Sequence, residues 1–592
     1  MSRKFFLFFC VCTSLHFSKE EPDSTKLDWW QTSLVYQIYP LSFKDSNGDG
    51  YGDLNGIHEK LDYIKDLGVT TIWIQPFSKS PMVDLGYDIS DFKSVDPVFG
   101  TIADFKELVK AVKNRGMKLI IDFVPNHTSD QSEWFKLSEQ RIEPYTDFYI
   151  WRDGKKVNDT YTTYPNNWLS IFGTSAWFWS KTRQQYYYHK CAPEQPDLNY
   201  RNPKVITEME SVLRFWLDLG VDGFRVDAVQ ILFEAAHGMD EPKSSDVNWI
   251  DGWIYTWEQP ENIEMVKSWR TLLDAYSKKD GQTRLLAVEM YSTPTKLLEY
   301  TGNATNPGAH IPFYFNLIYA VPEMNAFGVN TLIHQQTDIF PRSANNWVMD
   351  NHDNMRLRAR LFDASVDSWN MLVLLLPGLA SIYYGTEIGL DNLKLRSDQR
   401  KDRQNGGNGR IDLRDIYRGP MQWDDTDNAG FSTSDKTWLP VHPNYWRDNV
   451  KAQQQDPHSH LNIFKRLAAL RKTPVIMHGD LKTYVPKTWV FMFTRSLGKS
   501  ETIAVLINIG SESEEICPKD AAEQLPDEMF VHTCSGNSKI RVGEKVRISS
   551  FGGVKCLKMR PQSGLVLSTS SGALSTVSAT IILLAFCAKF LE

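Results

Sequence analysis

The feature that most constrains this chain is a unit that occurs three times, made of an amphipathic helix, a glycine and a buried strand. Apolar residues at helical spacing precede Gly68, Gly116 and Gly220, and a short apolar run follows each glycine. Strands that are apolar throughout are typical of parallel sheets covered by helices. The repeat therefore predicts parallel β/α units.

The predicted fold class is α/β, a (β/α)8 TIM barrel with an inserted subdomain after strand 3 and a C-terminal all-β domain. The eight strand segments are residues 34–39, 70–75, 119–124, 223–227, 285–289, 311–316, 347–350 and 380–384. Eight such strands close into a barrel. Residues 128–200 lack helical periodicity, and alternating apolar runs after Leu481 are typical of antiparallel strands.

These patterns divide the 592 residues into consecutive parts. The predicted parts are a signal peptide (1–18), the first part of the barrel (27–127), the inserted subdomain (128–200), the second part of the barrel (201–480, irregular at about 390–457), the β domain (481–560) and a tail (561–592). A chain of this length accommodates a barrel with insertions and a second domain.

Both ends of the sequence carry targeting signals. Basic residues followed by an apolar run at 5–17 predict a signal peptide, because the run is shorter than the roughly 20 residues of a membrane span. Small residues at 568–573 before an apolar block at 581–588 have the order of a glycolipid (GPI) anchor signal. We therefore expect a membrane protein held by a lipid anchor on the extracellular face of the plasma membrane. The alternatives are an uncleaved anchor, a frayed tail and a secreted protein.

Composition narrows the partners further. The net charge of −7 argues against nucleic acid. Asn158 and Asn303 begin N-x-T glycosylation acceptors. After loss of the two ends, four cysteines remain, and a disulfide among the last three is compatible with a secreted chain. These cysteines are Cys191, Cys517, Cys534 and Cys556, and their spacing does not select a pair.

Acidic residues stand at the ends of several predicted strands. Asp227, Glu289 and Asp353 each end or closely follow an apolar run, and Asp122 and His127 end another. A parallel barrel brings the carboxyl ends of its strands to one mouth, where its catalytic groups lie. Paired carboxylates at such a mouth indicate acid-catalysed cleavage of a glycosidic bond.

The motifs around these acids resemble those of glycoside hydrolase family 13, the α-amylase family. Within it, the chain is most similar to α-glucosidases, in particular insect gut maltases and sucrases. The resemblance spans about Trp29 to Lys558 and rests on motifs at residues 86–88 (GYD), 122–127 (DFVPNH), 195–199 (QPDLN), 223–229 (GFRVDAV), 287–291 (AVEMY) and 351–353 (NHD).

The resemblance implies roles for the acids. Asp227 would be the nucleophile, Glu289 the general acid and then base, and Asp353 a clamp on sugar hydroxyls. The other residues that it implies in substrate binding are Asp88, Tyr87, His127, Phe172, Arg225, His352 and Arg418. Of these, Asp88 would bond the terminal hydroxyls of the non-reducing glucose and thereby favour exo-attack.

Three positions bear on substrate choice. In relatives, a small residue such as Ala228 goes with α-1,4 bonds. Gly419 departs from the usual Thr, and Cys191 replaces an aromatic residue on the acceptor side.

The resemblance implies a retaining exo-α-glucosidase that releases α-glucose from maltose- or sucrose-type sugars, with possible transfer to a second sugar. The location expected from it is the apical surface of the gut. The alternative is a catalytically minor, barrel-fold binding protein of the cell surface, either a transporter-associated glycoprotein or a toxin receptor. Transporter heavy chains share this fold, but they carry an N-terminal membrane helix and generally lack the full acid set. The sequence leaves the preferred sugar and the oligomeric state open.

The loop at 45–53 has the oxygen spacing of a calcium site. The resemblance implies one structural Ca²⁺ here and no cofactor for catalysis. Its expected ligands are Asp45, Asn47, Asp49, the Tyr51 carbonyl and Asp53. The alternative is a polar turn without an ion.

Overall fold

The computed structural model describes residues 27–157, 162–242, 253–402, 414–498, 501–550 and 557–570. The predicted signal peptide, Asn158, Cys556 and the tail after residue 570 lie outside the described residues. No helix in the described ranges is long and apolar enough to cross a membrane.

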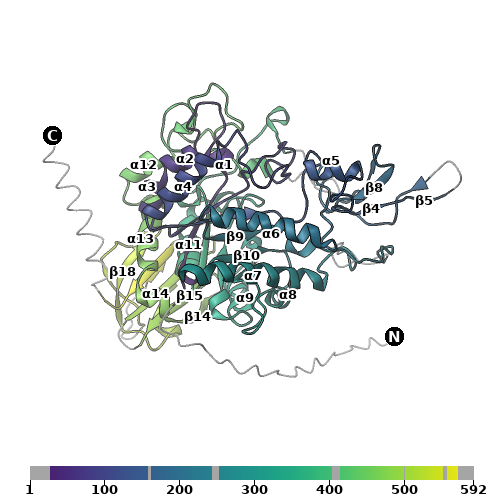
Figure 1. Cartoon of the computed structure of the whole chain (residues 1–592). Helices are drawn as coiled ribbons and strands as arrows, with labels where there is room; N and C mark the ends of the chain where they lie inside the picture. Colours follow the sequence, from purple (N-terminus) through teal and green to yellow (C-terminus); the bar gives the residue numbers. More distant parts are fainter. Residues whose placement is uncertain are drawn as a thin grey trace, which may run out of the picture.

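A single parallel sheet of eight strands forms the barrel, in the order β11-β10-β9-β3-β2-β1-β13-β12 (Figure 1). The strands are β1 (Leu34–Ile38), β2 (Thr71–Ile74), β3 (Lys118–Phe123), β9 (Gly223–Val226), β10 (Leu285–Glu289), β11 (Ile311–Phe313), β12 (Asn346–Val348) and β13 (Leu379–Tyr383). All eight predicted strands are present, so the predicted α/β barrel is confirmed.

The third repeated unit shows how the sequence builds this barrel. Helix α6 (Pro203–Asp218) begins after the Asn202 cap and buries one apolar face. Gly220 then adopts a φ of +99°, which L-residues rarely reach, and so reverses the chain into β9. Helix α4 (Ile102–Asn114) precedes β3 in the same way. The apolar residues before Gly68 do not form one continuous helix, because the segment breaks at Lys60 into α2 (Leu54–Glu59) and α3 (Leu61–Asp66).

The barrel closes through a side chain rather than a backbone ladder. Within the described sheet, β11 and β12 are the two ends of the strand order. The Asn346 amide bridges them, since its Oδ1 accepts from the Tyr314 N–H at 3.0 Å and its Nδ2 donates to the Pro312 carbonyl at 2.9 Å. Asn346 is fully buried, so it satisfies backbone groups that have no access to water.

The segment after β3 contains a small sheet that projects to one side of the barrel (Figure 1). Its strands are β4 (Trp151–Arg152), β7 (Trp177–Ser180) and β8 (Gln185–Tyr188), and β5 (Lys155–Lys156) pairs with β6 (Thr162–Thr163). The buried Trp168, Trp177 and Tyr188 pack against one another. Helix α5 (Glu133–Glu139) also lies here, although the sequence showed no helical periodicity.

The C-terminal part is an antiparallel sheet in the order β14-β15-β16-β21-β18-β19, with a separate β17–β20 pair. The predicted all-β architecture is confirmed, but its predicted end at residue 560 is too early. Strand β21 lies in the part predicted as a tail, and it pairs with β16 and β18 inside the sheet. The strands are β14 (Asp480–Lys487), β15 (Val490–Leu497), β16 (Glu501–Asn508), β17 (Glu514–Ile516), β18 (Glu528–Cys534), β19 (Lys545–Arg547), β20 (Leu557–Met559) and β21 (Gly564–Ser568). Cys517 is disulfide-bonded, whereas the buried Cys191 and Cys534 have free thiols.

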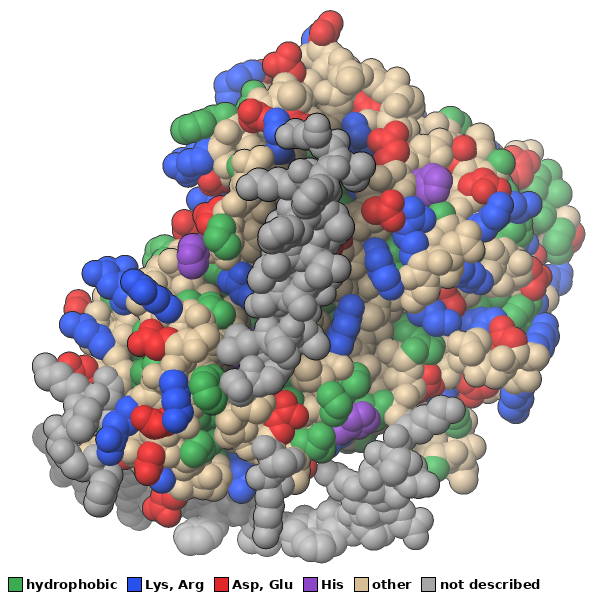
Figure 2. Space-filling model, turned by 90° about the vertical axis from the view of Figure 1, so that its left-hand side faces the viewer, with side chains coloured by type: hydrophobic (Ala, Val, Ile, Leu, Met, Phe, Trp, Pro, Cys, Tyr) green, Lys and Arg blue, Asp and Glu red, His purple; other side chains and the backbone are tan. Residues whose placement is uncertain are grey.

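The remaining elements connect and cover these sheets. The helices are α1 (Pro40–Phe43), α7 (Pro260–Asp280), α8 (Pro294–Glu299), α9 (Ala326–Thr337), α10 (Leu357–Leu361), α11 (Val366–Leu375), α12 (Val450–Gln455), α13 (His460–Arg471), α14 (Pro474–His478) and α15 (Pro518–Ala521). Short 3-10 helices are η1 (Trp29–Thr32), η2 (Val229–Ile231), η4 (Asn316–Tyr319), η5 (Arg342–Ala344), η6 (Asp363–Ser365), η7 (Thr386–Ile388), η8 (Ser397–Gln399), η10 (Arg414–Tyr417) and η11 (Asp427–Gly430). On the face shown in Figure 2, acidic and basic side chains are interspersed.

Candidate active site

Four carboxylates come together at the carboxyl ends of the barrel strands, and one of them, Asp353, follows β12. Asp122 lies near the end of β3, Asp227 directly follows β9, and Glu289 ends β10. These strands are neighbours in the sheet, so their ends adjoin. The Asp227 N–H donates to the Phe123 carbonyl at 2.8 Å, which extends the ladder by one residue and fixes the Asp227 backbone.

One buried guanidinium joins three of these acids. Arg225 Nη1 lies 3.0 Å from Asp122 Oδ2 and 2.7 Å from Asp227 Oδ1, and Nη2 contacts Glu289 Oε2. The Arg225 side chain is 1% exposed, so the charge-assisted bonds are shielded from water. Arg225 therefore sets the mutual orientation of Asp227 and Glu289.

Glu289 has the environment of a proton donor. Burial raises its pKa well above the usual value for a glutamate, Arg225 opposes this shift, and the charges of Asp227 and Asp353 raise the pKa further. A hydrogen bond with Asp227 acts in the same direction. A carboxyl group whose pKa is raised in this way can serve as a general acid.

Asp353 lies in the opposite electrostatic environment. Burial alone would raise its pKa, but His352, Arg418 and Arg414 outweigh burial and hold the pKa below its usual range. Arg418 Nη2 lies 2.8 Å and Arg414 Nη1 lies 3.7 Å from Asp353 Oδ1, and His352 Nε2 lies 3.0 Å from Oδ2. Asp353 is therefore an ionised acceptor for hydroxyl groups.

The Tyr87 and His352 rings stack beside these acids, with centroids 5.4 Å apart and planes within 4°. Gln37 Nε2 lies 3.1 Å from His352 Nδ1, so Nδ1 accepts and Nε2 carries the proton that faces Asp353. Burial holds the pKa of His352 well below its usual value, which keeps the ring neutral. The Tyr87 hydroxyl donates to Asp122 at 2.9 Å.

His127 also reaches this cluster, as the sequence predicted. Its Nε2 lies 3.2 Å from the Tyr87 carbonyl and 3.0 Å from Gln195 Nε2. Burial lowers the pKa of His127, so this ring is a neutral hydrogen-bonding group as well.

The prediction for Asp88 is wrong, and Asp84 takes the expected place. The Asp88 carboxylate bonds within its own loop, to Ser80 Oγ at 2.8 Å and to the N–H groups of Val83 and Asp84 at 2.9 Å. Asp84 instead pairs with Arg414 at 2.7 Å, the same Arg414 that faces Asp353.

Sequence reasoning thus missed Asp84 and Arg414, and it quoted Asp122 and Gln195 without giving them a role. Gln195 Nε2 donates to Asp84 Oδ2 at 2.9 Å, which ties its QPDLN motif to the site. The signal for Asp84 was its position three residues before Tyr87 in the same loop.

Two further predicted positions differ in outcome. Arg418 lies beside Asp353 and donates to the His352 carbonyl at 2.9 Å. Phe172 is half-buried in the turn at 170–174, and the contacts described for it stay within that turn. Next to Arg418, Leu393 explains Gly419, because a Cβ at 419 would lie 2.7 Å from Leu393 Cγ.

The predicted calcium loop is stabilised by its own side chains. Asp45 accepts the N–H groups of Asn47, Gly48 and Gly50, and Asp53 caps α2. Among the described residues, no group of three or more His, Cys, Asp or Glu side chains is placed to hold a metal ion. The donor set consists only of oxygen, which suits Ca²⁺. Both carboxylate oxygens of Asp45 already accept two hydrogen bonds each, so an ion would have to displace some of these bonds.

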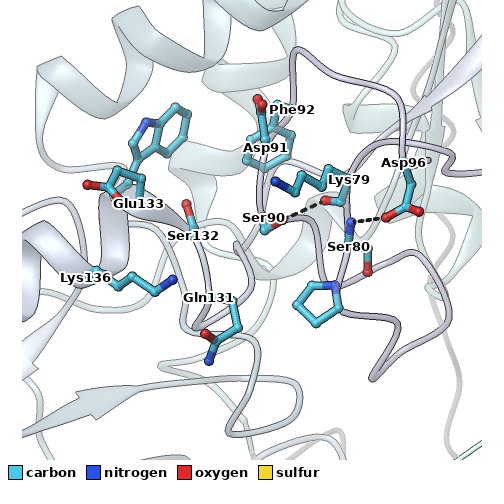
Figure 3. A pocket seen from close by; sticks show the side chains of 12 residues that line it. Lys79, Ser80, Ser90, Asp91, Phe92, Asp96, Gln131, Ser132, Glu133 and Lys136 are labelled. Carbon is cyan, nitrogen blue, oxygen red and sulfur yellow. Dashed lines mark hydrogen bonds between the residues drawn. The ribbon is translucent and has the colours of Figure 1, made fainter. Parts of the chain in front are cut away.

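A cavity of about 560 Å³ lies beside the loop that carries Asp84 and Tyr87 (Figure 3). Lys79, Ser80 and Ser90 form one wall, and residues 131–134 and Lys136 form the other. The lining is polar and of mixed charge, and it includes none of the predicted site residues. This cavity is therefore separate from the acid cluster.

The barrel and its acid cluster define a class of protein, and comparison with known proteins identifies it. The profile "Alpha amylase, catalytic domain" matches residues 37–479. The chain belongs to the α-amylase family, glycoside hydrolase family 13.

Particular relatives cover most of the chain. It is 43% identical over 505 residues to a salivary alpha-glucosidase of Aedes aegypti, covering 83% of this chain and 87% of the relative. It is 39% identical to an amino acid transporter heavy chain of Homo sapiens, covering 89% and 76%. Among solved structures, an isomaltulose synthase variant of Erwinia rhapontici in complex with sucrose superposes with a TM-score of 0.80 at 31% identity, covering 92% and 99%.

Proposed function

We propose that this protein is a retaining, exo-acting α-glucosidase. The observation that carries the proposal is the contact of Asp227 and Glu289 with the one guanidinium of Arg225. Retaining glycosidases have carboxyl groups about 5 Å apart, whereas inverting enzymes need about 6.5–9.5 Å to admit a water between them. The alternative, a binding protein without catalysis, leaves this complete set of acids without a role.

The chemistry then follows from the protonation states. Asp227 attacks the anomeric carbon while Glu289 donates its proton to the glycosidic oxygen, so the leaving sugar departs as an alcohol and a glucosyl-enzyme ester remains. Glu289, now a carboxylate, takes a proton from water, and the water oxygen attacks the same carbon and releases Asp227. Two inversions give net retention. A second sugar in place of water yields a transfer product.

The arrangement around these acids supports attack on a terminal glucose. Asp353, with its ionised oxygens, accepts hydrogen bonds from sugar hydroxyls, and Tyr87 offers an aromatic ring. The Asp84–Arg414 pair connects the Tyr87 loop to Asp353 and supplies both a donor and an acceptor for hydroxyls at the end of the sugar. These groups bind one terminal ring, which fits maltose- and sucrose-type substrates.

The direct test is the anomeric configuration of the first product. Proton NMR during the first minutes of maltose hydrolysis should show α-glucose before mutarotation. Early β-glucose would mean inversion and would remove the nucleophile role of Asp227.

Linkage preference is proposed from Ala228, the residue after Asp227. Ala228 is partly exposed and adopts a left-handed conformation with a φ of +47°, where β-branched side chains are strongly disfavoured. Its small side chain leaves room beside the nucleophile for an α-1,4 leaving group. We expect kcat/KM to rank maltose and sucrose above isomaltose, and isomaltose in first place would refute this preference.

We also propose that the enzyme acts outside the cell, held by a GPI anchor at the gut surface, with simple secretion as the alternative. The proposal rests on the signals at the two ends of the sequence and on the salivary relative named above. A phosphatidylinositol-specific phospholipase should release the activity from membranes. Activity that stays bound, or that is soluble from the start, contradicts the anchor and leaves the chemistry intact.

Finally, we propose that the loop at 45–53 holds a structural Ca²⁺. Asp45 also accepts from Ser432 Oγ, so the loop is tied to the irregular segment near residue 432. Chelation with EDTA should lower the melting temperature, and added Ca²⁺ should restore it. A melting temperature that does not change with EDTA would favour the polar turn without an ion.

A further inference from the structure

Lys190 is a buried lysine that has no part in the proposed chemistry. Its side chain is 0% exposed. The Nζ atom donates to Thr256 Oγ1 at 2.8 Å and to the Leu169 carbonyl at 3.0 Å, and it lies 3.5 Å from the centroid of the Trp253 ring. Removing an ammonium group from water costs several kcal/mol, so these contacts must offset a substantial penalty.

The contacts of Lys190 hold two other segments together. Leu169 begins the turn that carries Phe172, and the Ile171 N–H donates to the Lys190 carbonyl at 2.8 Å. Thr256 lies in the connection between β9 and α7, which starts directly after Asp227. The Thr256 hydroxyl in turn donates a hydrogen bond to Glu241 Oε1 at 3.1 Å. One ammonium group thus fixes the turn at 169–174 against the connection that follows the nucleophile.

This junction is linked directly to the sugar-binding groups. The Lys190 N–H donates to Asp197 Oδ1 at 2.8 Å, and Asp197 forms a β-bridge with His127. Gln195, two residues earlier, bonds both His127 and Asp84. A shift of Lys190 would therefore move Asp197 and, through it, the hydrogen bonds of His127 at the edge of the acid cluster.

Both segments that Lys190 joins expose apolar side chains. Leu169 is 42%, Met239 52% and Ile254 51% exposed. The Trp168 indole donates to the Met239 carbonyl at 2.8 Å, which brings the two segments together from a second direction. Leu169 lies in the segment that carries Phe172, and Met239 and Ile254 lie in the connection that begins at Asp227. Apolar side chains in these two segments can contact the C–H face of a sugar ring.

We propose that Lys190 is a positioning residue for the half of the site that binds the leaving sugar and the acceptor sugar. Lys190 itself does not touch the sugar; it holds the turn at 169–174 and the segment around Thr256 in place. This inference rests on the proposed glucosidase function. Burial lowers the pKa of Lys190 to about 7. The groups that face it, the Glu241 and Asp197 carboxylates and the buried Cys191 thiol, act in the opposite direction. The junction should therefore weaken as the pH rises above 7.

The test compares two substrates that differ only in the leaving group. Fluoride occupies no sugar-binding surface and leaves without protonation, so kcat/KM for α-glucosyl fluoride reports Asp227 and the groups that bind the terminal glucose. The value for maltotriose also reports Glu289 as the acid and the acceptor half. In Lys190→Gln, we expect kcat/KM for maltotriose to fall about tenfold or more and kcat/KM for the fluoride to stay within about twofold. Loss of the Glu289 proton lowers the ratio of the two values in both proteins as the pH rises, so we expect a steeper fall between pH 6 and 8 in the wild type than in Lys190→Gln; equal slopes would contradict a role for the Lys190 charge.

Lys155→Gln is the matched control. Lys155 lies in the same inserted segment and binds Asp240 of the same connection at 3.2 Å, but its side chain is 54% exposed. It should therefore change neither rate. If Lys190→Gln fails to fold, Thr256→Val removes the same junction at its other end.

If kcat/KM in Lys190→Gln falls equally for both substrates, Lys190 has only a structural role. If neither value changes, Lys190 has no role. Either result overturns the proposal. A wild-type protein that does not cleave α-glucosyl fluoride refutes the glucosidase function itself.

Discussion

His460, the first residue of α13, should stabilise the folded protein through its positive charge. Its Nδ1 lies 2.6 Å from Asp367 Oδ1, and its Nε2 lies 3.3 Å from Asp363 Oδ1. Asp367 Oδ2 also accepts from the Gly536 N–H at 2.8 Å, in the turn after β18, so the pair lies where the barrel meets the C-terminal part. Burial lowers the pKa of His460, but the two carboxylates outweigh it and raise the pKa to about 10.

The size of the effect follows from proton linkage. An unfolded histidine has a pKa of about 6.5, and each tenfold gain in proton affinity on folding is worth about 1.4 kcal/mol, which sets an upper limit of about 5 kcal/mol. The His460 side chain is 21% exposed, so water screens part of this, and we expect 2–3 kcal/mol, about half of the limit. Because the folded pKa is raised, the stabilisation is complete below about pH 6.5 and is lost as the pH rises through 10.

The assay is thermal unfolding of the wild type and His460→Gln at pH 6 and pH 9. The unfolding entropy of a chain of this length makes 1 kcal/mol worth roughly 1 °C, so the variant should melt about 2–3 °C lower at pH 6. At pH 9 the gap should shrink to under about 1 °C.

His334→Gln is the control, because His334 pairs with Asp338 at 3.1 Å on the surface, with 43% of its side chain exposed. Because exposed ion pairs contribute little to stability, His334→Gln should change the melting temperature by less than about 1 °C at both pH values. If the gap for His460→Gln is as large at pH 9 as at pH 6, the imidazolium is not the stabilising form.

Three further predictions concern the catalytic acids, the barrel closure and Gly419. Glu289→Gln should lower kcat on maltose by about 10²–10⁴ but affect the formation of the glucosyl-enzyme from α-glucosyl fluoride far less, since fluoride needs no protonation. Asp227→Asn should abolish both reactions. Equal effects of Glu289→Gln on both substrates would contradict the acid role. Asn346→Ala should lower the free energy of unfolding in urea by about 2–4 kcal/mol, because the Tyr314 N–H and the Pro312 carbonyl lose their partner; a loss below about 0.5 kcal/mol would mean that this bridge is not needed. Gly419→Thr should cost about 1–3 kcal/mol by overlap with Leu393, and Leu393→Ala should relieve part of that cost in the double variant; strictly additive losses would contradict the overlap.

The barrel was predictable because its strands are short apolar runs that end at chemically distinctive residues. Asp227 and Glu289 could be found for the same reason, since the end of a strand fixes where its last side chain lies. Asp84 and Asp88 could not be told apart from the sequence, because both lie in one irregular loop. Only the folded loop shows that Ser80 and two backbone amides donate to the Asp88 carboxylate.

Long-range pairing is the other part that the sequence could not supply. Arg414 reaches Asp84 across 330 positions of the chain. The raised pKa of Glu289 and the lowered pKa of Asp353 likewise depend on which groups surround each acid after folding. Residue type alone predicts two carboxylates, and the different protonation of each comes from tertiary structure.

The way the barrel closes has a consequence for the width of the site. Glu289 ends β10, which adjoins β11, and Asp353 follows β12, so the proton donor and the hydroxyl clamp stand on opposite sides of the junction between β11 and β12. Every other pair of neighbouring strands in this sheet is held by a ladder of peptide hydrogen bonds, and here the connection is the rotatable amide of Asn346. The separation between Glu289 and Asp353 therefore depends on one side-chain amide, and not on a ladder of peptide hydrogen bonds.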